Sequence, residues 1–239
     1  MGTTRRRLLT AGALALGSTL VAAEEALAAD DYGSGELGPW DTGQRRISEP
    51  STIRQVRDTD GLYMFGDSIS VQDGYALAVR LKARTGDLLA VHNWSGRPTA
   101  PAVDALQDWA TTYGMPKRIL MATGSNDIFA PPVMAAQIDR VMSIAGSTRT
   151  VYWVNVQVAR TSVTDAVRLA DQRNSAWVNL QLADAQARHA NLRIIHWAEF
   201  LAAKPSRLTM YLRDGVHTSY PEKGQDARNE LICDAIAAS

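Results

Sequence analysis

The stretch Leu62-Tyr63-Met64-Phe65-Gly66-Asp67-Ser68-Ile69 decides how this chain is organised. Its first four residues form an apolar run typical of a buried strand, and the run breaks at Gly66. Apolar residues then recur at helical spacing, so the stretch predicts a strand, a tight turn and a helix. Such a turn would hold the Ser68 hydroxyl at the carboxyl edge of a sheet, beside the free amides of the first helical turn. Because the same tripeptide also suits an ordinary helix cap, its chemistry depends on what the other loops place beside it.

The same alternation of apolar run and helical pattern continues to the end of the sequence. Further strands are predicted around 88–91, 118–123, 150–156 and 193–196, and helices around 69–86, 103–110, 131–144, 172–189 and 224–238. This pattern predicts an α/β fold of three α/β/α layers with a five-stranded, mostly parallel sheet. The loops that follow the strands are therefore expected together at one edge of the sheet, where such folds bind ligands.

Composition limits the class of protein. The chain has 239 residues, 46% of them hydrophobic, with 25 Lys and Arg balancing 25 Asp and Glu. This is enough for one domain with a full core, and the balanced charge gives no indication of nucleic acid as a partner. The one cysteine, Cys233, lies in the predicted last helix and is interpreted as a packed apolar residue, so no internal disulfide is expected.

The amino terminus resembles an export signal of the twin-arginine type. Arg5-Arg6-Arg7 precedes a mildly apolar stretch, 8–23, and Ala26-Leu27-Ala28 offers small residues for cleavage. We interpret 1–28 as a signal peptide and 29–60, which is rich in Gly, Ser, Pro and charge, as a flexible arm. The alternative is an uncleaved membrane anchor. We expect a secreted or extracytoplasmic monomer without stable membrane association after cleavage.

A serine nucleophile needs a base, and the sequence offers four histidines. His92, His189 and His196 are interpreted as structural. His217 lies in Asp214-Gly215-Val216-His217, just before the last helix, where the chain can return to the same sheet edge. An aspartate three residues before a histidine can accept the imidazole N–H and fix its tautomer.

Four blocks in order, Gly66-Asp67-Ser68, Gly96, Gly124-Ser125-Asn126-Asp127 and Asp214 to His217, resemble those of the SGNH (GDSL) hydrolase superfamily. The resemblance spans 62–238 and implies a flavodoxin-like SGNH hydrolase domain at 61–239. It implies that Ser68 is the nucleophile, His217 the general base and Asp214 its orienting partner. It also implies an oxyanion hole made by the backbone N–H groups of Ser68 and Gly96 and the side-chain amide of Asn126. No cofactor and no metal are expected, because the sequence has no His-Glu-x-x-His motif, no paired cysteines and no Walker loop.

Some segments are similar to the SGNH domains of membrane acyltransferases that O-acetylate cell-wall glycans, namely 94–97, 151–156, 195–197 and 211–213. We therefore expect a secreted serine esterase for small acyl esters, acetyl or short-chain, of a small molecule or a carbohydrate. The alternatives are an O-acyltransferase that uses the same acyl-enzyme and a non-catalytic carbohydrate-binding module. Arg97 is left as either a ligand contact or a salt bridge in its loop. Trp94, Trp153 and Trp197 are left as either sugar platforms or core residues.

Overall fold

A computed structural model describes residues 32–221 and 223–238 of the chain. The predicted signal peptide, 1–28, lies outside the described residues. Within them, no helix combines the length and the apolar character that crossing a bilayer requires.

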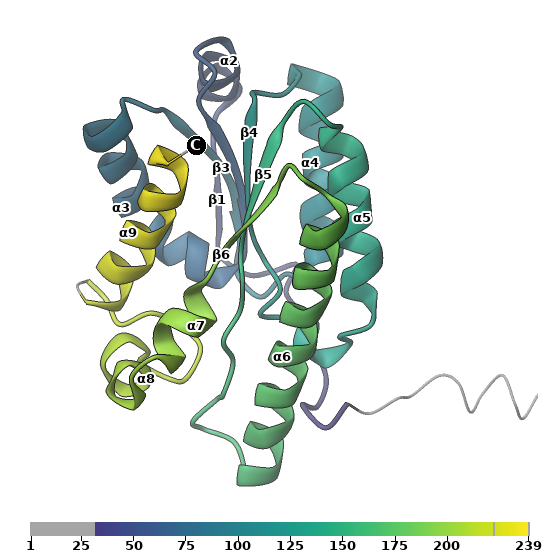
Figure 1. Ribbon diagram of the computed structural model, residues 1–239, viewed down its shortest axis with the longest axis vertical. Helices are drawn as coiled ribbons and strands as arrows, with labels where there is room; N and C mark the ends of the chain where they lie inside the picture. The colour runs from purple at the N-terminus through teal and green to yellow at the C-terminus, as the bar shows by residue number, and fades with distance from the viewer. Residues whose placement is uncertain (1–31, 222, 239) are drawn as a thin grey trace, which may run out of the picture. The chain divides into compact units, whose positions relative to one another are not determined.

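The described residues form a sheet between two helical layers (Figure 1). The strands are β1 (Arg45–Ile47), β2 (Leu62–Gly66), β3 (Leu89–Trp94), β4 (Arg118–Ala122), β5 (Thr150–Val154) and β6 (Leu192–Ile195). The helices are α2 (Pro50–Asp58), α3 (Ser68–Thr85), α4 (Thr99–Tyr113), η1 (Asp127–Phe129), α5 (Val133–Ala145), α6 (Asp165–Arg188), α7 (Trp197–Ala202), α8 (Pro205–Tyr211) and α9 (Gly224–Ala237).

Strand order in the sheet is β1-β3-β2-β4-β5-β6, with every neighbouring pair parallel except β1 and β3. Strand β2 lies between β3 and β4, and Gly66 at its end is level with Asn93 and Ala122 on those neighbours. The loops after these three strands therefore leave the sheet at the same height. This is the edge at which the sequence predicted a site.

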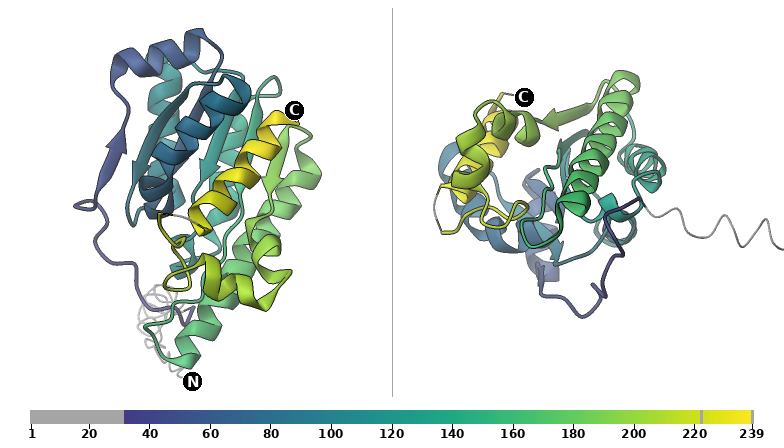
Figure 2. Two further views of the ribbon diagram at one scale, coloured as in Figure 1. Left: turned by 90° about the vertical axis from the view of Figure 1, so that its left-hand side faces the viewer. Right: turned by 90° about the horizontal axis from the view of Figure 1, so that it is seen from below.

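Alternation along β2 divides the core between the two faces of the sheet. Tyr63 and Phe65 belong to the cluster under α4, α5 and α6, whereas Leu62 and Met64 belong to the cluster under α3, α7 and α9. All four side chains are buried, as expected for a strand covered on both sides. Helices α3 and α9 lie side by side over the second face (Figure 2).

The predicted α/β/α architecture is confirmed, but the predicted strand number is wrong, because the sheet has six strands. Strand β1 and helix α2 lie within 29–60, so the interpretation of that segment as a flexible arm is also wrong over these residues. Strand β1 pairs antiparallel with the edge strand β3 and exposes all its side chains. The Arg45 guanidinium lies 4.1 Å from the Trp94 ring centroid. This edge strand is held by backbone hydrogen bonds and one cation–π contact and buries no side chain. Its sequence therefore lacks the alternation of apolar and polar residues from which a strand is predicted.

Candidate active site

The turn after β2 places Ser68 as the first residue of α3. A Cβ on Gly66 would lie 2.2 Å from the Ser70 side chain, so only glycine fits here. The buried Asp67 carboxylate accepts a hydrogen bond from the Ile69 N–H at 3.0 Å and caps the helix. Asp67 therefore holds the turn locally, and the Ser68 hydroxyl lies at the end of a central strand.

Ser68, His217 and Asp214 form a continuous chain of hydrogen bonds. Ser68 Oγ lies 2.8 Å from His217 Nε2, and His217 Nδ1 lies 2.8 Å from Asp214 Oδ2. Asp214 Oδ1 also accepts the backbone N–H groups of His217, at 2.8 Å, and Val216, at 3.0 Å. With Nδ1–H donating to the carboxylate, Nε2 is free to accept the serine proton.

The Asp214 carboxylate is built to stay charged. Partial burial on its own raises its pKa, but the hydrogen bonds from the backbone and ring of His217 and the backbone of Val216 outweigh this and bring the pKa below its ordinary value. A carboxylate that remains ionised can stabilise the imidazolium that forms when His217 takes up a proton.

Backbone pairing on both sides closes the loop that carries Asp214 and His217. Leu212 and Thr218 form an antiparallel bridge, and the Arg213 N–H donates to the His217 carbonyl at 2.9 Å. From the opposite side, the Thr161 N–H donates to the Asp214 carbonyl at 3.0 Å. The two residues are therefore held by main-chain bonds at both ends of the loop.

Three groups predicted as oxyanion donors lie on neighbouring loops. The amides of Ser68 and Gly96 have no hydrogen-bond acceptor among the described residues, and Gly96 has a φ of 79°. Asn126 Nδ2 donates one N–H to the Arg97 carbonyl at 3.1 Å, which leaves its second N–H for a ligand. Asn126 lines one of the two cavities at Ser68. Gly96 lines neither of them, although its neighbour Ser95 lines the other.

Arg97 is buried away from any ligand and forms no salt bridge within residues 32–221 and 223–238, so the structure supports neither alternative left by the sequence. Its guanidinium is fully buried and donates to the Gly66 carbonyl at 3.1 Å, to His92 Nδ1 at 2.8 Å and to the His92 carbonyl. Burial and the neighbouring Arg97 lower the pKa of His92 to about 4, so this ring is neutral and accepts. Arg97 thus fixes the end of β2 to β3.

The Asp127 carboxylate, to which the sequence analysis gave no separate role, ties the loop after β4 to the loop after β3. It is buried and accepts the Thr99 N–H at 3.1 and 3.0 Å and the Thr99 hydroxyl at 2.7 Å, at the start of α4. Burial raises its pKa to about 6 despite these bonds. A polar residue next to the expected donor Asn126 was the only signal in the sequence.

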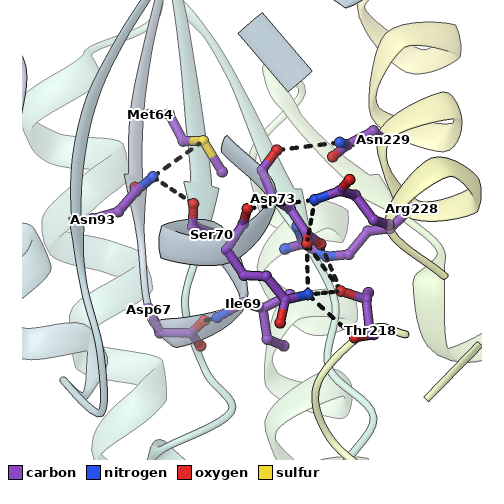
Figure 3. Close-up of polar contacts among 11 residues, drawn as sticks. Met64, Asp67, Ile69, Ser70, Asp73, Asn93, Thr218, Arg228 and Asn229 are labelled. Carbon is purple, nitrogen blue, oxygen red and sulfur yellow. Dashed lines mark hydrogen bonds and ion pairs between the residues drawn. The ribbon is translucent and has the colours of Figure 1, made fainter. Parts of the chain in front are cut away.

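The structure also shows a buried polar cluster around Asp73 and Thr218 that the sequence did not predict (Figure 3). The Thr218 hydroxyl donates to the Asp73 carboxylate on α3 and lies 2.9 Å from each of its oxygens. The Gln72 side-chain amide also donates to this carboxylate, at 2.9 Å. From α9, Gln225 Nε2 lies 3.3 Å and Arg228 Nη1 3.8 Å from this carboxylate. Helix α3, which begins with Ser68, therefore also anchors Thr218, the residue after His217.

The remaining candidates from the sequence are structural. His196 and His189 contact Glu199 and Asp139 respectively, and neither lines a cavity that contains Ser68. Trp153 and Trp197 are buried in the core, so the sugar-platform alternative is wrong for both. Trp94 is partly buried against the Trp40 ring at 5.1 Å.

Two cavities meet at Ser68 and His217. One, of about 200 Å³, is lined by apolar side chains and the polar groups of the site, namely Ser68, Ser125, Asn126, Ile128, Phe129, Val158, Arg160, Ser162, Asp214, Val216 and His217. The other, of about 640 Å³, is more polar and is lined by Gln44, Arg46, Ser68, Val71, Gln72, Ser95, Arg213, His217 and Tyr220. A carbonyl carbon at Ser68 Oγ would thus have space on two sides.

Solved structures with this fold share little sequence with the chain. A lipase/acylhydrolase from Enterococcus faecalis has a TM-score of 0.60 at 20% identity, over 74% of this chain and 95% of that one. The catalytic domain of peptidoglycan O-acetyltransferase A from Streptococcus pneumoniae, solved with a methylsulfonyl adduct, has a TM-score of 0.57 at 17% identity, over 75% and 91%. A GDSL-like lipase from Bacteroides thetaiotaomicron has a TM-score of 0.60 at 16% identity, over 76% and 89%. No family model and no curated protein sequence matches the chain.

The chain therefore has the fold of the SGNH (GDSL) hydrolases, as the four sequence blocks predicted. Among the proteins that share it are a lipase/acylhydrolase, a GDSL-like lipase and the catalytic domain of an O-acetyltransferase.

Replacing Thr218 tests whether the buried cluster holds the histidine loop. Thr218→Val keeps the side-chain shape but removes the hydroxyl that donates to Asp73. We expect the free energy of unfolding to fall by about 1–3 kcal/mol, because a buried carboxylate loses one of its two closest donors. Urea denaturation measures it.

Two matched variants complete this test. Thr218→Ser retains the hydroxyl and should lose less than Thr218→Val. Thr209→Val removes an exposed hydroxyl that bonds only its own helix, and should change stability little. An equal loss in Thr218→Val and Thr209→Val would contradict the anchoring role.

Proposed function

We propose that this protein is a serine esterase that hydrolyses small acyl esters through an acyl-enzyme. The observation that carries the proposal is the continuous chain Ser68 Oγ, His217, Asp214, with 2.8 Å at each link, at the mouth of two cavities. The similarity to solved lipases and acylhydrolases of the same fold supports it.

In the proposed reaction, Ser68 Oγ attacks the ester carbonyl carbon while His217 Nε2 takes the hydroxyl proton. The carbonyl oxygen becomes an anion, which the N–H groups of Ser68, Gly96 and Asn126 would stabilise, each by about 3 kcal/mol. As the carbon–oxygen bond to the alcohol breaks, His217 gives its proton to the departing oxygen. His217 then takes a proton from water, which attacks the acyl-enzyme. As the bond from the acyl carbon to Ser68 Oγ breaks, His217 returns this proton to Ser68 Oγ and the acid is released.

The acyl group is proposed to occupy the smaller cavity. Its volume of about 200 Å³ and its apolar lining by Ile128, Phe129, Val158 and Val216 suit a short acyl chain. The polar lining of the larger cavity suits an alcohol such as a sugar.

Acyl transfer to a sugar hydroxyl is the second candidate. The similarity to the catalytic domain of a peptidoglycan O-acetyltransferase favours it, and an acceptor alcohol would use the larger cavity in place of water. Product analysis with an oligosaccharide acceptor separates transfer from hydrolysis. A non-catalytic carbohydrate-binding module is disfavoured by the complete Ser68, His217 and Asp214 arrangement.

We also propose export by the twin-arginine route, with the mature protein acting as a monomer free of the membrane. The support is the Arg5-Arg6-Arg7 motif and the small residues at Ala26-Leu27-Ala28. Amino-terminal sequencing of protein from the extracytoplasmic fraction, followed by light scattering, tests both points.

Replacing the nucleophile tests the proposal directly. Ser68→Ala should lower kcat/KM for p-nitrophenyl acetate by at least about 1,000-fold, because it removes the serine hydroxyl that is hydrogen-bonded to His217 Nε2. Ser206→Ala, at an exposed serine on α8, is the matched control and should keep the parental rate. An unchanged rate in a folded Ser68→Ala protein would refute the assignment.

The pH dependence tests the base. Protonated His217 cannot accept the Ser68 proton, so kcat/KM should fall about tenfold per pH unit on the acid side and recover as the pH rises. The pKa of Asp214 is lowered, so its carboxylate is not the group that takes up this proton. The fall of kcat/KM on the acid side should therefore follow the uptake of a single proton. Tryptophan fluorescence checks folding at each pH, and a profile flat from about pH 4 to about pH 9 would count against a histidine base.

The length of the acyl chain tests the assignment of the smaller cavity. Along p-nitrophenyl acetate, butyrate and octanoate, kcat/KM should be lowest for octanoate, because the cavity is too small for it. Phe129→Ala removes a ring from the lining and should raise the octanoate-to-acetate ratio. A rate that grows with chain length in the parent protein would place the acyl group elsewhere.

A further inference from the structure

The two cavities at Ser68 differ in charge as well as size. Arg160 lines the smaller one, but its guanidinium is bound to the buried Asp171 carboxylate through two contacts of 2.7 Å. The larger cavity is lined by Arg46 and Arg213, and no described acidic residue lines it. The charge of Arg160 is therefore balanced by Asp171, whereas the described residues that line the larger cavity include two arginines and no carboxylate.

Arg46 is placed there by the edge strand that the sequence did not predict. It lies on β1, in register with Asn93 of β3, and its side chain is exposed. Among residues 32–221 and 223–238, no carboxylate forms an ion pair with Arg46. An unpaired guanidinium in a cavity that reaches the nucleophile is available to a ligand.

Arg213 supplies the second positive charge in the lining of the larger cavity. It directly precedes Asp214, but its Nε lies 3.7 Å from Asp214 Oδ2, farther than the 2.8 Å that separates this oxygen from His217 Nδ1. Asp214 is thus engaged mainly by the histidine. The Arg213 side chain is half exposed and keeps donors for an added anion.

The reaction decides which part of an ester meets these arginines. His217 must reach the alcohol oxygen to protonate it, and His217 lines both cavities. With the acyl chain in the small apolar cavity, the alcohol is directed into the large one. There Gln44, Gln72 and Ser95 offer hydrogen-bond partners for hydroxyl groups.

We propose that the larger cavity binds the alcohol moiety of the substrate and that this moiety carries an anionic group, a carboxylate or a phosphate, which pairs with Arg46 and Arg213. The inference rests on the proposed esterase function and narrows its substrate class to esters of hydroxylated, negatively charged alcohols. Two planar guanidinium groups that face one cavity match the oxygen geometry of both kinds of anion.

Substituted phenyl acetates of similar size test the charge preference. The para-carboxylate, para-carboxamide and para-trimethylammonium esters are compared, each kcat/KM being divided by the rate constant for spontaneous hydrolysis. The parent protein should prefer the carboxylate over the carboxamide by about fivefold, or about 1 kcal/mol, and should use the trimethylammonium ester least. Added salt should reduce the preference.

Variants assign the preference to the two arginines. In Arg46→Gln the carboxylate-to-carboxamide ratio should fall, and in the double variant Arg46→Gln with Arg213→Gln it should fall further, to about 1. Taking a ratio removes any general effect of a variant on the reaction. Arg54→Gln, an exposed arginine on α2 outside the cavities, is the matched control and should keep the parental ratio.

The outcomes separate this inference from the function on which it rests. If neither the carboxylate ester nor the carboxamide ester is hydrolysed, the proposed esterase function fails. If both are hydrolysed with a ratio near 1 in the parent protein, or if the ratio survives in the double variant, the esterase stands and the anionic alcohol site is refuted.

Discussion

The buried hydrogen bond between Asp73 and Thr218 is the contact on which the rest of the site depends. Ser68 and Asp73 belong to the same helix, α3, so their separation is fixed by helix geometry. Thr218 follows His217 directly, and Asp73 binds it at 2.9 Å. Helix α3 thus carries Ser68 and also anchors the residue next to His217, although His217 itself lies in a loop. Arg228 on α9 offsets the charge of the buried carboxylate.

The oxyanion side is built by the same means, with buried side chains that tie one loop to the next. The Arg97 guanidinium joins the end of β2 to β3, and the Asn126 amide joins the loop after β4 to the loop after β3. The Asp127 carboxylate accepts the first N–H of α4. Because β2, β3 and β4 end level with one another, these ties are short. A parallel sheet whose central strands end together therefore supplies the framework, and the polar cross-links make the framework specific.

The main strands, the helices between them and the three residues Ser68, Asp214 and His217 could be predicted, because long apolar runs and polar loops are local signals. The edge strand β1 could not, since Arg45-Arg46-Ile47 buries none of its side chains and depends on backbone pairing with distant β3. Asp73 and Arg97 were missed or misread for another reason. One sequence does not show which polar residues are buried together, and their partners lie far along the chain.

The central claim is that Ser68 is a nucleophile activated by His217, and covalent labelling tests it most directly. The folded protein is treated with a fluorophosphonate, and the adduct is located by peptide mass spectrometry, with a His217→Ala variant in parallel. The account predicts one adduct, on Ser68, that forms far more slowly in His217→Ala. No adduct, an adduct on another serine such as Ser95 or Ser125, or equal labelling of both proteins would contradict it.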